Sequence, residues 1–370
     1  MRADLNPKIY WVGFNLVKGI GAVRFQHLLK HFGSLEIAWQ APVEALMQAG
    51  LNQRLAERVL QVRRQVSLDQ IWEQIQKKHI QVLTWDDGEY PRRLLEIDQP
   101  PPVLYLRGSI SPEDQWAVAT VGTRRVTVYG RQIAEEIGRF LAEHGITVVS
   151  GLARGVDAIC HQAALDAGGR TIAVLGSGVD AVYPPENRTL AAKIIEQGAL
   201  VSDYPVGTPP ESSNFPPRNR IISGLSMATI VVEAGETSGA LITAEFAAEQ
   251  GREVFAVPGS ILAPQSKGAN RLIEQGARPL LNLEDLVESL HLEHFPEHRV
   301  TRALIPGNEN EARILKILSA EARHMDEIAS LSGLPIQTVS ATLTVLELKG
   351  MVRPVGGSNY ISIHESRAKY

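Results

Sequence analysis

The sequence predicts an α/β protein with a doubly wound, largely parallel sheet, preceded by a helical region and followed by a smaller one. From about residue 80 to residue 292, short apolar runs alternate with amphipathic stretches. This alternation is the pattern of repeated strand–helix units. Most of these runs are continuous, as expected for strands buried on both faces. Small-residue loops follow nearly every run, which places glycines at the carboxyl edge of the sheet, where open α/β sheets bind ligands.

The elements of this middle region follow from that pattern. Strands are predicted at residues 117–121, 146–149, 171–175, 199–203, 229–233 and 253–257. The helices between them include residues 131–144, 240–250 and 270–275.

Chain length, charge distribution and the proline-containing segments that interrupt the pattern divide the chain further. We expect a helical domain at residues 1–78, a Rossmann-like domain at 79–292, a linker at 293–307 and a winged-helix domain at 308–370. The net charge of −4 conceals a basic head, because residues 1–64 hold nine Lys and Arg against four Asp and Glu. Residues 281–330 reverse this balance, with five against ten.

Composition excludes several classes of protein. With 44% hydrophobic and 21% charged residues, the chain is neither disordered nor fibrous. A single cysteine, Cys160, excludes an internal disulfide and a multi-cysteine zinc site, and fits a reducing compartment. No apolar run approaches the roughly 18 residues of a membrane helix. We therefore expect a cytoplasmic protein without membrane insertion.

The N-terminal region contains a Gly-x-Gly turn between two predicted helices. Gly19 and Gly21 form this turn, and Lys18 and Arg24 flank it. The pattern is similar to a helix-hairpin-helix element, whose turn amides face a nucleic-acid phosphate. A second, weaker match to the same pattern follows at Gly50. These residues are secondary DNA-binding candidates; the alternative is a helical corner whose glycines only make the turn.

The glycine-rich loops of the sheet predict a phosphate-binding edge. Neither the dinucleotide fingerprint nor a P-loop occurs in them, so no nucleotide cofactor is expected. Several arginines lie in or near the loops, and arginine forks grip phosphate oxygens in pairs. Several phosphate sites along one edge suit a polymer backbone better than a single nucleotide. The candidates in these loops are Gly122, Thr123, Arg124, Ser150, Gly151, Arg154, Gly155, Ser238 and Gly239.

The segment from Phe215 to Arg220 adds a second indication of nucleic acid. An aromatic residue precedes two prolines and then Arg218, Asn219 and Arg220. This order suits a platform on which a base stacks, beside groups that bind phosphate. The alternative is that Phe215 fills a loop core and Arg218 pairs with an acid.

The catalytic alternatives are weaker. Asp157 and His161 are spaced to meet on one helix face and could form an acid–base pair, but an aspartate in a first turn more often complements the helix dipole. Glu233 ends a predicted strand and could grip a ribose or a backbone amide. Cys160 adjoins His161 but points about 100° away on a helix. We assign no catalytic residue and no metal site.

The ordered motifs of the middle region resemble the DNA-processing protein A (DprA/Smf) family. They include Gly-Thr-Arg at 122–124, Ser-Gly-Leu-Ala-Arg-Gly at 150–155, Phe-Pro-Pro-Arg-Asn-Arg at 215–220 and Ser-Gly-Ala-Leu-Ile-Thr-Ala at 238–244. The resemblance spans residues of about 85 to 280.

The resemblance implies a single-stranded-DNA-binding protein of natural transformation, not an enzyme. Such a protein protects incoming DNA, forms a homodimer through the Rossmann-like domain and loads a RecA-type recombinase. By the same resemblance, Arg124 grips a phosphate and Phe215 stacks on a base. Two lysines found in some relatives are replaced here by Pro185 and Ser212. The alternative is a nucleotide-processing enzyme of the nucleoside-monophosphate phosphoribohydrolase type, whose Pro-Gly-Gly-x-Gly-Thr loop differs from residues 233–239.

The tail predicts three helices and a hairpin, the order of a winged helix. Its third helix, within residues 335–347, has no Lys or Arg. Because duplex affinity rests largely on phosphate neutralisation, we favour a protein-contact or regulatory role, with weak DNA binding as the alternative.

Overall fold

The structure, a computed structural model, describes residues 6–290, 309–318, 323–348 and 352–362. The chain forms two compact units that divide near His298. The predicted linker, residues 293–307, lies outside the described residues. The boundary near residue 78 stays a prediction, because the N-terminal helices and the sheet share one unit.

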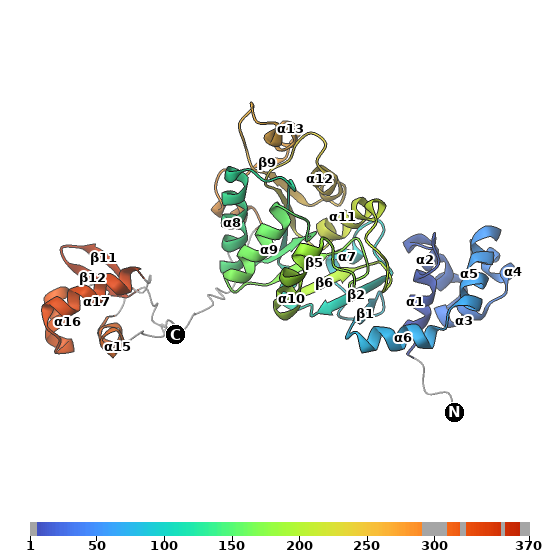
Figure 1. The fold of residues 1–370 in the computed structure, drawn as a ribbon, viewed down its shortest axis with the longest axis horizontal. Coiled ribbons are helices and arrows are strands. Elements are labelled where there is room, and N and C mark those ends of the chain that lie inside the picture. Colours follow the sequence, from blue (N-terminus) through green and yellow to red (C-terminus); the bar gives the residue numbers. More distant parts are fainter. Residues whose placement is uncertain (1–5, 291–308, 319–322, 349–351, 363–370) are drawn as a thin grey trace. The chain divides into compact units, whose positions relative to one another are not determined.

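The predicted helical region consists of six short helices, coloured blue in Figure 1. Phe14, Phe25, Leu28 and Leu46 are fully buried between them. The same apolar cluster continues into Val82 and Tyr105 of the first two strands, so the helices pack against that end of the sheet. The helices are α1 (Lys8–Asn15), α2 (Ala22–Phe32), α3 (Leu35–Gln40), α4 (Val43–Gln48), α5 (Gln53–Gln65) and α6 (Leu68–Lys77).

The central sheet has nine strands in the order β1-β2-β6-β5-β4-β3-β7-β8-β9. All pairs from β6 to β9 are parallel, whereas β2 runs antiparallel to β1 and β6. This confirms the predicted doubly wound sheet and adds an antiparallel edge. The strands are β1 (Gln81–Thr84), β2 (Val103–Gly108), β3 (Ala117–Val121), β4 (Thr147–Ser150), β5 (Thr171–Val174), β6 (Ala199–Ser202), β7 (Ala228–Val231), β8 (Glu253–Ala256) and β9 (Arg278–Pro279).

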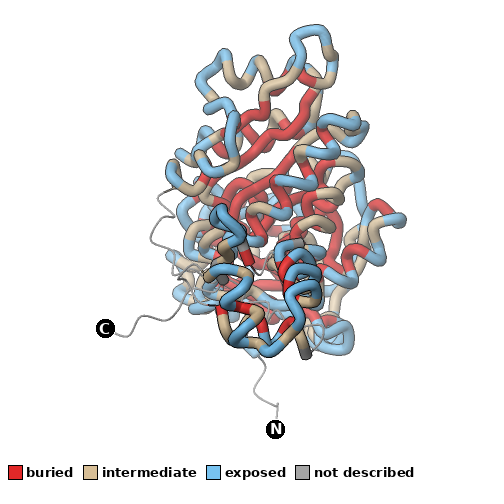
Figure 2. The backbone as a smooth tube through the Cα atoms, turned by 90° about the vertical axis from the view of Figure 1, so that its left-hand side faces the viewer, coloured by how far each residue is buried: buried red, intermediate tan, exposed pale blue. Residues whose placement is uncertain are grey.

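Helices cover both faces of the sheet, and the strands between them are buried (Figures 1 and 2). Along β3, Val118 faces one helical layer while Ala117 and Ala119 face the other, as the two-residue period of a strand requires. The first layer contains α8 (Val128–Glu143), α9 (Val156–Asp166) and α10 (Arg188–Gln197). The second contains α7 (Arg92–Leu95), α11 (Phe215–Gly224), α12 (Gly239–Glu249) and α13 (Lys267–Glu274). A last helix, α14 (Glu284–Ser289), follows β9.

The C-terminal unit has the helices and the β-hairpin of the predicted winged helix. Ile314, Ile328, Val339 and Leu343 form its buried core. No single helix of the described residues is long and apolar enough to span a membrane. Among these residues, only the helices at Met325–Ser332 and Ile336–Glu347, taken together, reach that length and apolarity, and they are bent by 111° relative to each other. The elements are α15 (Glu309–Ile317), β10 (Arg323–His324), α16 (Met325–Ser332), α17 (Ile336–Leu348), β11 (Val352–Gly356) and β12 (Asn359–Ser362), with strand order β10-β12-β11.

Candidate nucleic-acid interface

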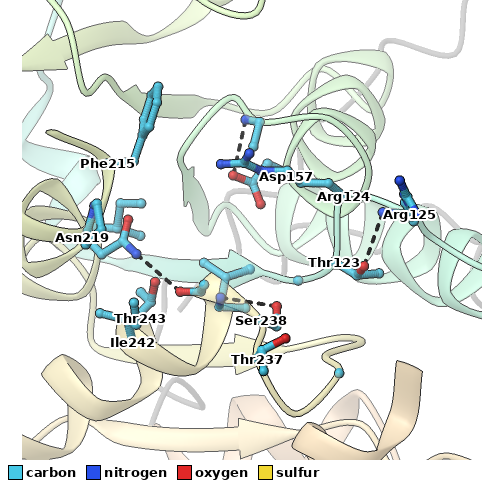
Figure 3. A pocket seen from close by; sticks show the side chains of 18 of the residues that line it. Thr123, Arg124, Arg125, Asp157, Phe215, Asn219, Thr237, Ser238, Ile242 and Thr243 are labelled. Atoms are coloured by element: carbon cyan, nitrogen blue, oxygen red, sulfur yellow. Dashed lines mark hydrogen bonds between the residues drawn. The ribbon is translucent and has the colours of Figure 1, made fainter. Parts of the chain in front are cut away.

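An open pocket of about 830 Å³ lies at the carboxyl edge of the sheet. The segments that follow β3, β4, β5, β6, β7 and β8 all contribute to it, and Figure 3 shows Phe215 on one side and Thr123, Arg124 and Arg125 on the other. Its lining includes Gly122, Thr123, Arg124, Arg125, Asp157, Tyr183, Phe215, Arg218, Asn219, Thr237, Ser238, Gly239 and Thr243.

Two glycines of these loops serve packing between loops. A Cβ at Gly155, whose φ is +77°, would collide with the carbonyl oxygen of Thr123. A Cβ at Gly122 would lie 2.5 Å from Val156. The prediction that glycine lets a ligand approach the backbone therefore needs correction at these positions, where the close neighbour is the protein. At Gly239, no atom lies within 4 Å of the position that a Cβ would take, so that first residue of α12 does leave open space.

Arg218 has turned inward, which corrects its predicted role as a phosphate clamp. Its side chain is only 5% exposed, and its Nη1 donates to the carbonyl oxygens of Gly151, at 2.9 Å, and Val174. Burial lowers the pKa of Arg218 to about 10, and the charge of Asp157 opposes that shift. In this arrangement Arg218 ties the loop after β4 to the end of β5 in the wall of the pocket.

Asp157 and His161 also act on the protein itself. Asp157 Oδ2 accepts from the backbone amides of Gly151, at 3.1 Å, and Ala153, at 3.3 Å, which fixes the β4–α9 loop. Burial raises the pKa of the Asp157 carboxyl, and Arg218 opposes this. His161 Nδ1 lies 2.6 Å from Thr171 Oγ1, and burial lowers the pKa of His161 to about 3. Both side chains are thus held by other parts of the protein, as the structural alternative for this pair predicts, while the buried His161 Nε2 has no hydrogen-bond partner in the described part of the chain.

Glu233 is bound to the start of α8. Its carboxylate accepts from the amide and the hydroxyl of Thr127, at 3.0 and 2.8 Å, and its carbonyl oxygen accepts from Thr123 N at 2.7 Å. It therefore braces the Gly122–Arg125 loop and has no free edge for a ribose. In the described part of the chain, no three His, Cys, Asp or Glu side chains gather as metal ligands.

The groups that remain available for a ligand are cationic and aromatic. Arg124 and Arg125 are exposed, and the guanidinium carbon of Arg124 lies 5.9 Å from the Phe215 ring centroid. Tyr183 lies beside Phe215, with centroids 5.7 Å apart and ring planes at 32°. Gly176 leaves room for the Phe215 ring, because a Cβ there would lie 2.7 Å from Phe215 Cδ1. No role was predicted for Tyr183 from the sequence, although it lines the pocket beside Phe215.

The other predicted site residues have protein partners. Arg154 pairs with Glu186, and Arg220 Nη2 lies 2.6 Å from Asp203 Oδ2. The Ser150 hydroxyl donates to Thr120 O at 2.5 Å, and the Asn219 side-chain amide donates to Gly239 O at 3.3 Å. The Ser238 hydroxyl caps α12. The structure thus brings Arg124, Phe215, Asn219, Ser238 and Gly239 to one pocket, while Arg154 and Arg220 enter ion pairs. Lys18, Gly19 and Gly21 lie in the turn between α1 and α2, and Arg24 lies in the first turn of α2; all four are outside this pocket.

Comparison with known proteins places this architecture in a family. A family model described as DNA recombination-mediator protein A matches residues 81–291, and a DprA winged helix domain matches residues 299–358. The chain belongs to the DprA/Smf family. It is 38% identical to Protein Smf of Synechocystis sp. over 392 residues, which covers 96% of this chain and 98% of that protein. It is 44% identical over 203 residues to DNA processing protein DprA of Bacillus subtilis, covering 55% and 68%.

Two solved structures of DprA proteins share the fold. DNA processing protein A of Streptococcus pneumoniae superimposes with a TM-score of 0.67 at 33% identity, covering 76% of this chain and 97% of that one. The Helicobacter pylori protein superimposes with a TM-score of 0.52 at 31% identity, covering 58% and 97%. The H. pylori structure was described for its single-stranded-DNA binding mode.

Proposed function

We propose that this protein is a non-enzymatic, single-stranded-DNA-binding DprA protein that holds the strand in the pocket between Phe215 and Arg124. This proposal rests mainly on the half-buried Phe215 ring, which lies in the pocket wall beside the exposed Arg124. An aromatic face binds any base, and a free guanidinium neutralises the phosphate next to it. That pairing suits a strand bound without regard to sequence.

Three further observations support a binder over the phosphoribohydrolase alternative. The carboxyl groups of Asp157 and Glu233 both accept hydrogen bonds from neighbouring loops, so neither is free to move a proton on a substrate. His161 is fully buried. The H. pylori relative binds single-stranded DNA.

The finer biological role follows the family resemblance. We propose that the protein works in the cytoplasm during natural transformation, where it protects incoming DNA and loads a RecA-type recombinase on it. A strand-exchange assay, in which the recombinase is offered DNA already covered by single-strand-binding protein, tests loading. Stimulation by the wild type is expected, and its absence would overturn this step alone.

We also propose that the protein is a homodimer through the Rossmann-like domain. Ile261 and Leu262, in the loop after β8, are 82% and 87% exposed, and a second copy could cover them. Sedimentation of the wild type and of Leu262→Glu tests this: a dimer that the charge dissociates is expected, and a wild-type monomer would refute it.

The binding proposal is tested by fluorescence anisotropy with a labelled oligonucleotide across a salt series. For a single strand, the log–log salt slope is about −0.7 per phosphate neutralised. Arg124→Glu is expected to weaken binding and flatten this slope by about one such unit. Arg139→Glu is the matched control, because Arg139 is also exposed but lies on α8, outside the pocket. Equal behaviour of the two variants would place the strand elsewhere.

A further inference from the structure

The helices before the sheet contain one hairpin repeated 31 residues apart. In the first, Gly19 (φ +102°) leads through Gly21 into α2, which begins at Ala22. In the second, Gly50 (φ +96°) leads through Asn52 into α5, which begins at Gln53. The turn glycine, the N-cap residue and the first helical residue thus recur at the same spacing. The weak sequence similarity at Gly50 therefore corresponds to a full structural repeat.

The two hairpins contact each other reciprocally. A Cβ at Gly19 would lie 3.6 Å from Nη1 of Arg58 on α5, and a Cβ at Gly50 would lie 3.0 Å from Nδ1 of His27 on α2. His27 and Arg58 are themselves 31 residues apart. Each turn therefore touches the equivalent residue of the other hairpin's second helix, as an approximate two-fold axis between the hairpins requires.

Cations converge on the first turn. Arg24 Nη1 donates to the carbonyl oxygen of Gly19 at 2.8 Å, and Arg58 Nη1 donates to that of Lys18 at 2.6 Å. The Lys18 side chain is exposed at the same turn. Within the described chain, none of the three belongs to an ion pair. Arg54 lies one helical turn before Arg58 on α5 and is exposed.

This arrangement has an electrostatic consequence. Like charges held together repel, and Arg54 and Arg58 at i and i+4 add a further unfavourable pair. The two guanidinium groups also cover the carbonyl oxygens of Lys18 and Gly19, which would otherwise repel an anion. The turn thus presents positive charge to solvent, and a polyanion would relieve the repulsion and release counterions.

We propose that the tandem hairpin of residues 16–65 binds the phosphate backbone of duplex DNA through its two turns, at Gly19 and Gly50. A duplex is favoured over a single strand because its two antiparallel strands are related by local two-fold axes, which an approximately two-fold pair of hairpins matches. This site is separate from the pocket at Phe215 and does not depend on it. The chain would therefore carry one site for single-stranded DNA and another for the duplex.

The test uses the full chain and a labelled blunt duplex, read by anisotropy across a salt series. Lys18→Glu is the informative variant, because Lys18 is exposed and its side chain holds none of the turn's backbone bonds. We expect it to weaken duplex binding about ten-fold at low salt and to reduce the salt slope by about one. Its affinity for a single strand should stay within about two-fold of wild type.

Lys30→Glu is the matched control, since it makes the same charge change at another exposed lysine of the first hairpin, in the last turn of α2 and away from the Gly19 turn. It should bind the duplex as wild type does. Arg124→Glu separates this proposal from the previous one, because it should lose the single strand and keep the duplex. The proposal is overturned if the wild type does not bind the duplex, if both lysine variants lose duplex affinity equally, or if Lys18→Glu loses the single strand to the same degree.

Discussion

Replacing Phe215 by alanine should weaken single-strand binding without unfolding the protein. The ring lies outside the apolar clusters of the described chain, and its ring neighbours are Tyr183 and the Arg124 guanidinium. Loss of one stacked base costs about 1–3 kcal/mol, which is about a 5- to 160-fold loss of affinity. Stability should change by less than about 1 kcal/mol, whereas truncating a core phenylalanine costs about 3–5 kcal/mol.

The assay is anisotropy with oligo-dT, oligo-dC and oligo-dA, together with urea unfolding of the same variant. The loss should be equal for all three oligonucleotides, because every base has a π-face. Gly176→Ala provides a graded control: its Cβ would lie 2.7 Å from Phe215 Cδ1, so the ring must shift and a smaller loss is expected. A base-dependent loss would mean that Phe215 reads sequence. An unchanged affinity, or a loss of stability typical of the core, would refute the stacking role.

Three further predictions concern the loops and the buried groups. Gly155→Ala should destabilise the fold by about 2 kcal/mol or more, because the φ of Gly155 is +77° and Thr123 O occupies the Cβ position. Urea unfolding measures this change, and a variant as stable as the wild type would contradict the prediction. Burial lowers the pKa of His161 to about 3, so only the unfolded chain gains this proton below about pH 6.5. Stability should therefore fall by about 2 kcal/mol between pH 7 and pH 5, and His161→Gln should remove that part of the fall; an unchanged pH dependence would exclude His161 as its source. Burial raises the pKa of Cys160 to about 12, so iodoacetamide at pH 8 should label it only after unfolding, and rapid labelling of the native protein would be inconsistent with this burial.

The sequence was sufficient for the parallel part of the sheet. Most of the strands from β3 to β8 are continuous apolar runs with a loop of small residues after them, so their burial and their shared carboxyl edge could be predicted directly. The antiparallel strands β1 and β2 were not predicted. Their pairing joins residues that are far apart in sequence, such as Tyr105 and Ser202, and no local period signals it.

The sequence also determined which chemistry the carboxyl edge offers, since arginines, an aromatic residue and glycines recur in its loops. Only the tertiary structure decided which of them face outward. Arg218, Arg154 and Arg220 cannot be told from Arg124 by their sequence surroundings. Their directions depend on acceptors in other segments of the chain, namely Val174, Glu186 and Asp203. An arginine has the same five donors wherever it stands, so its role is set by the acceptors that the fold brings within reach, and those come from distant parts of the chain.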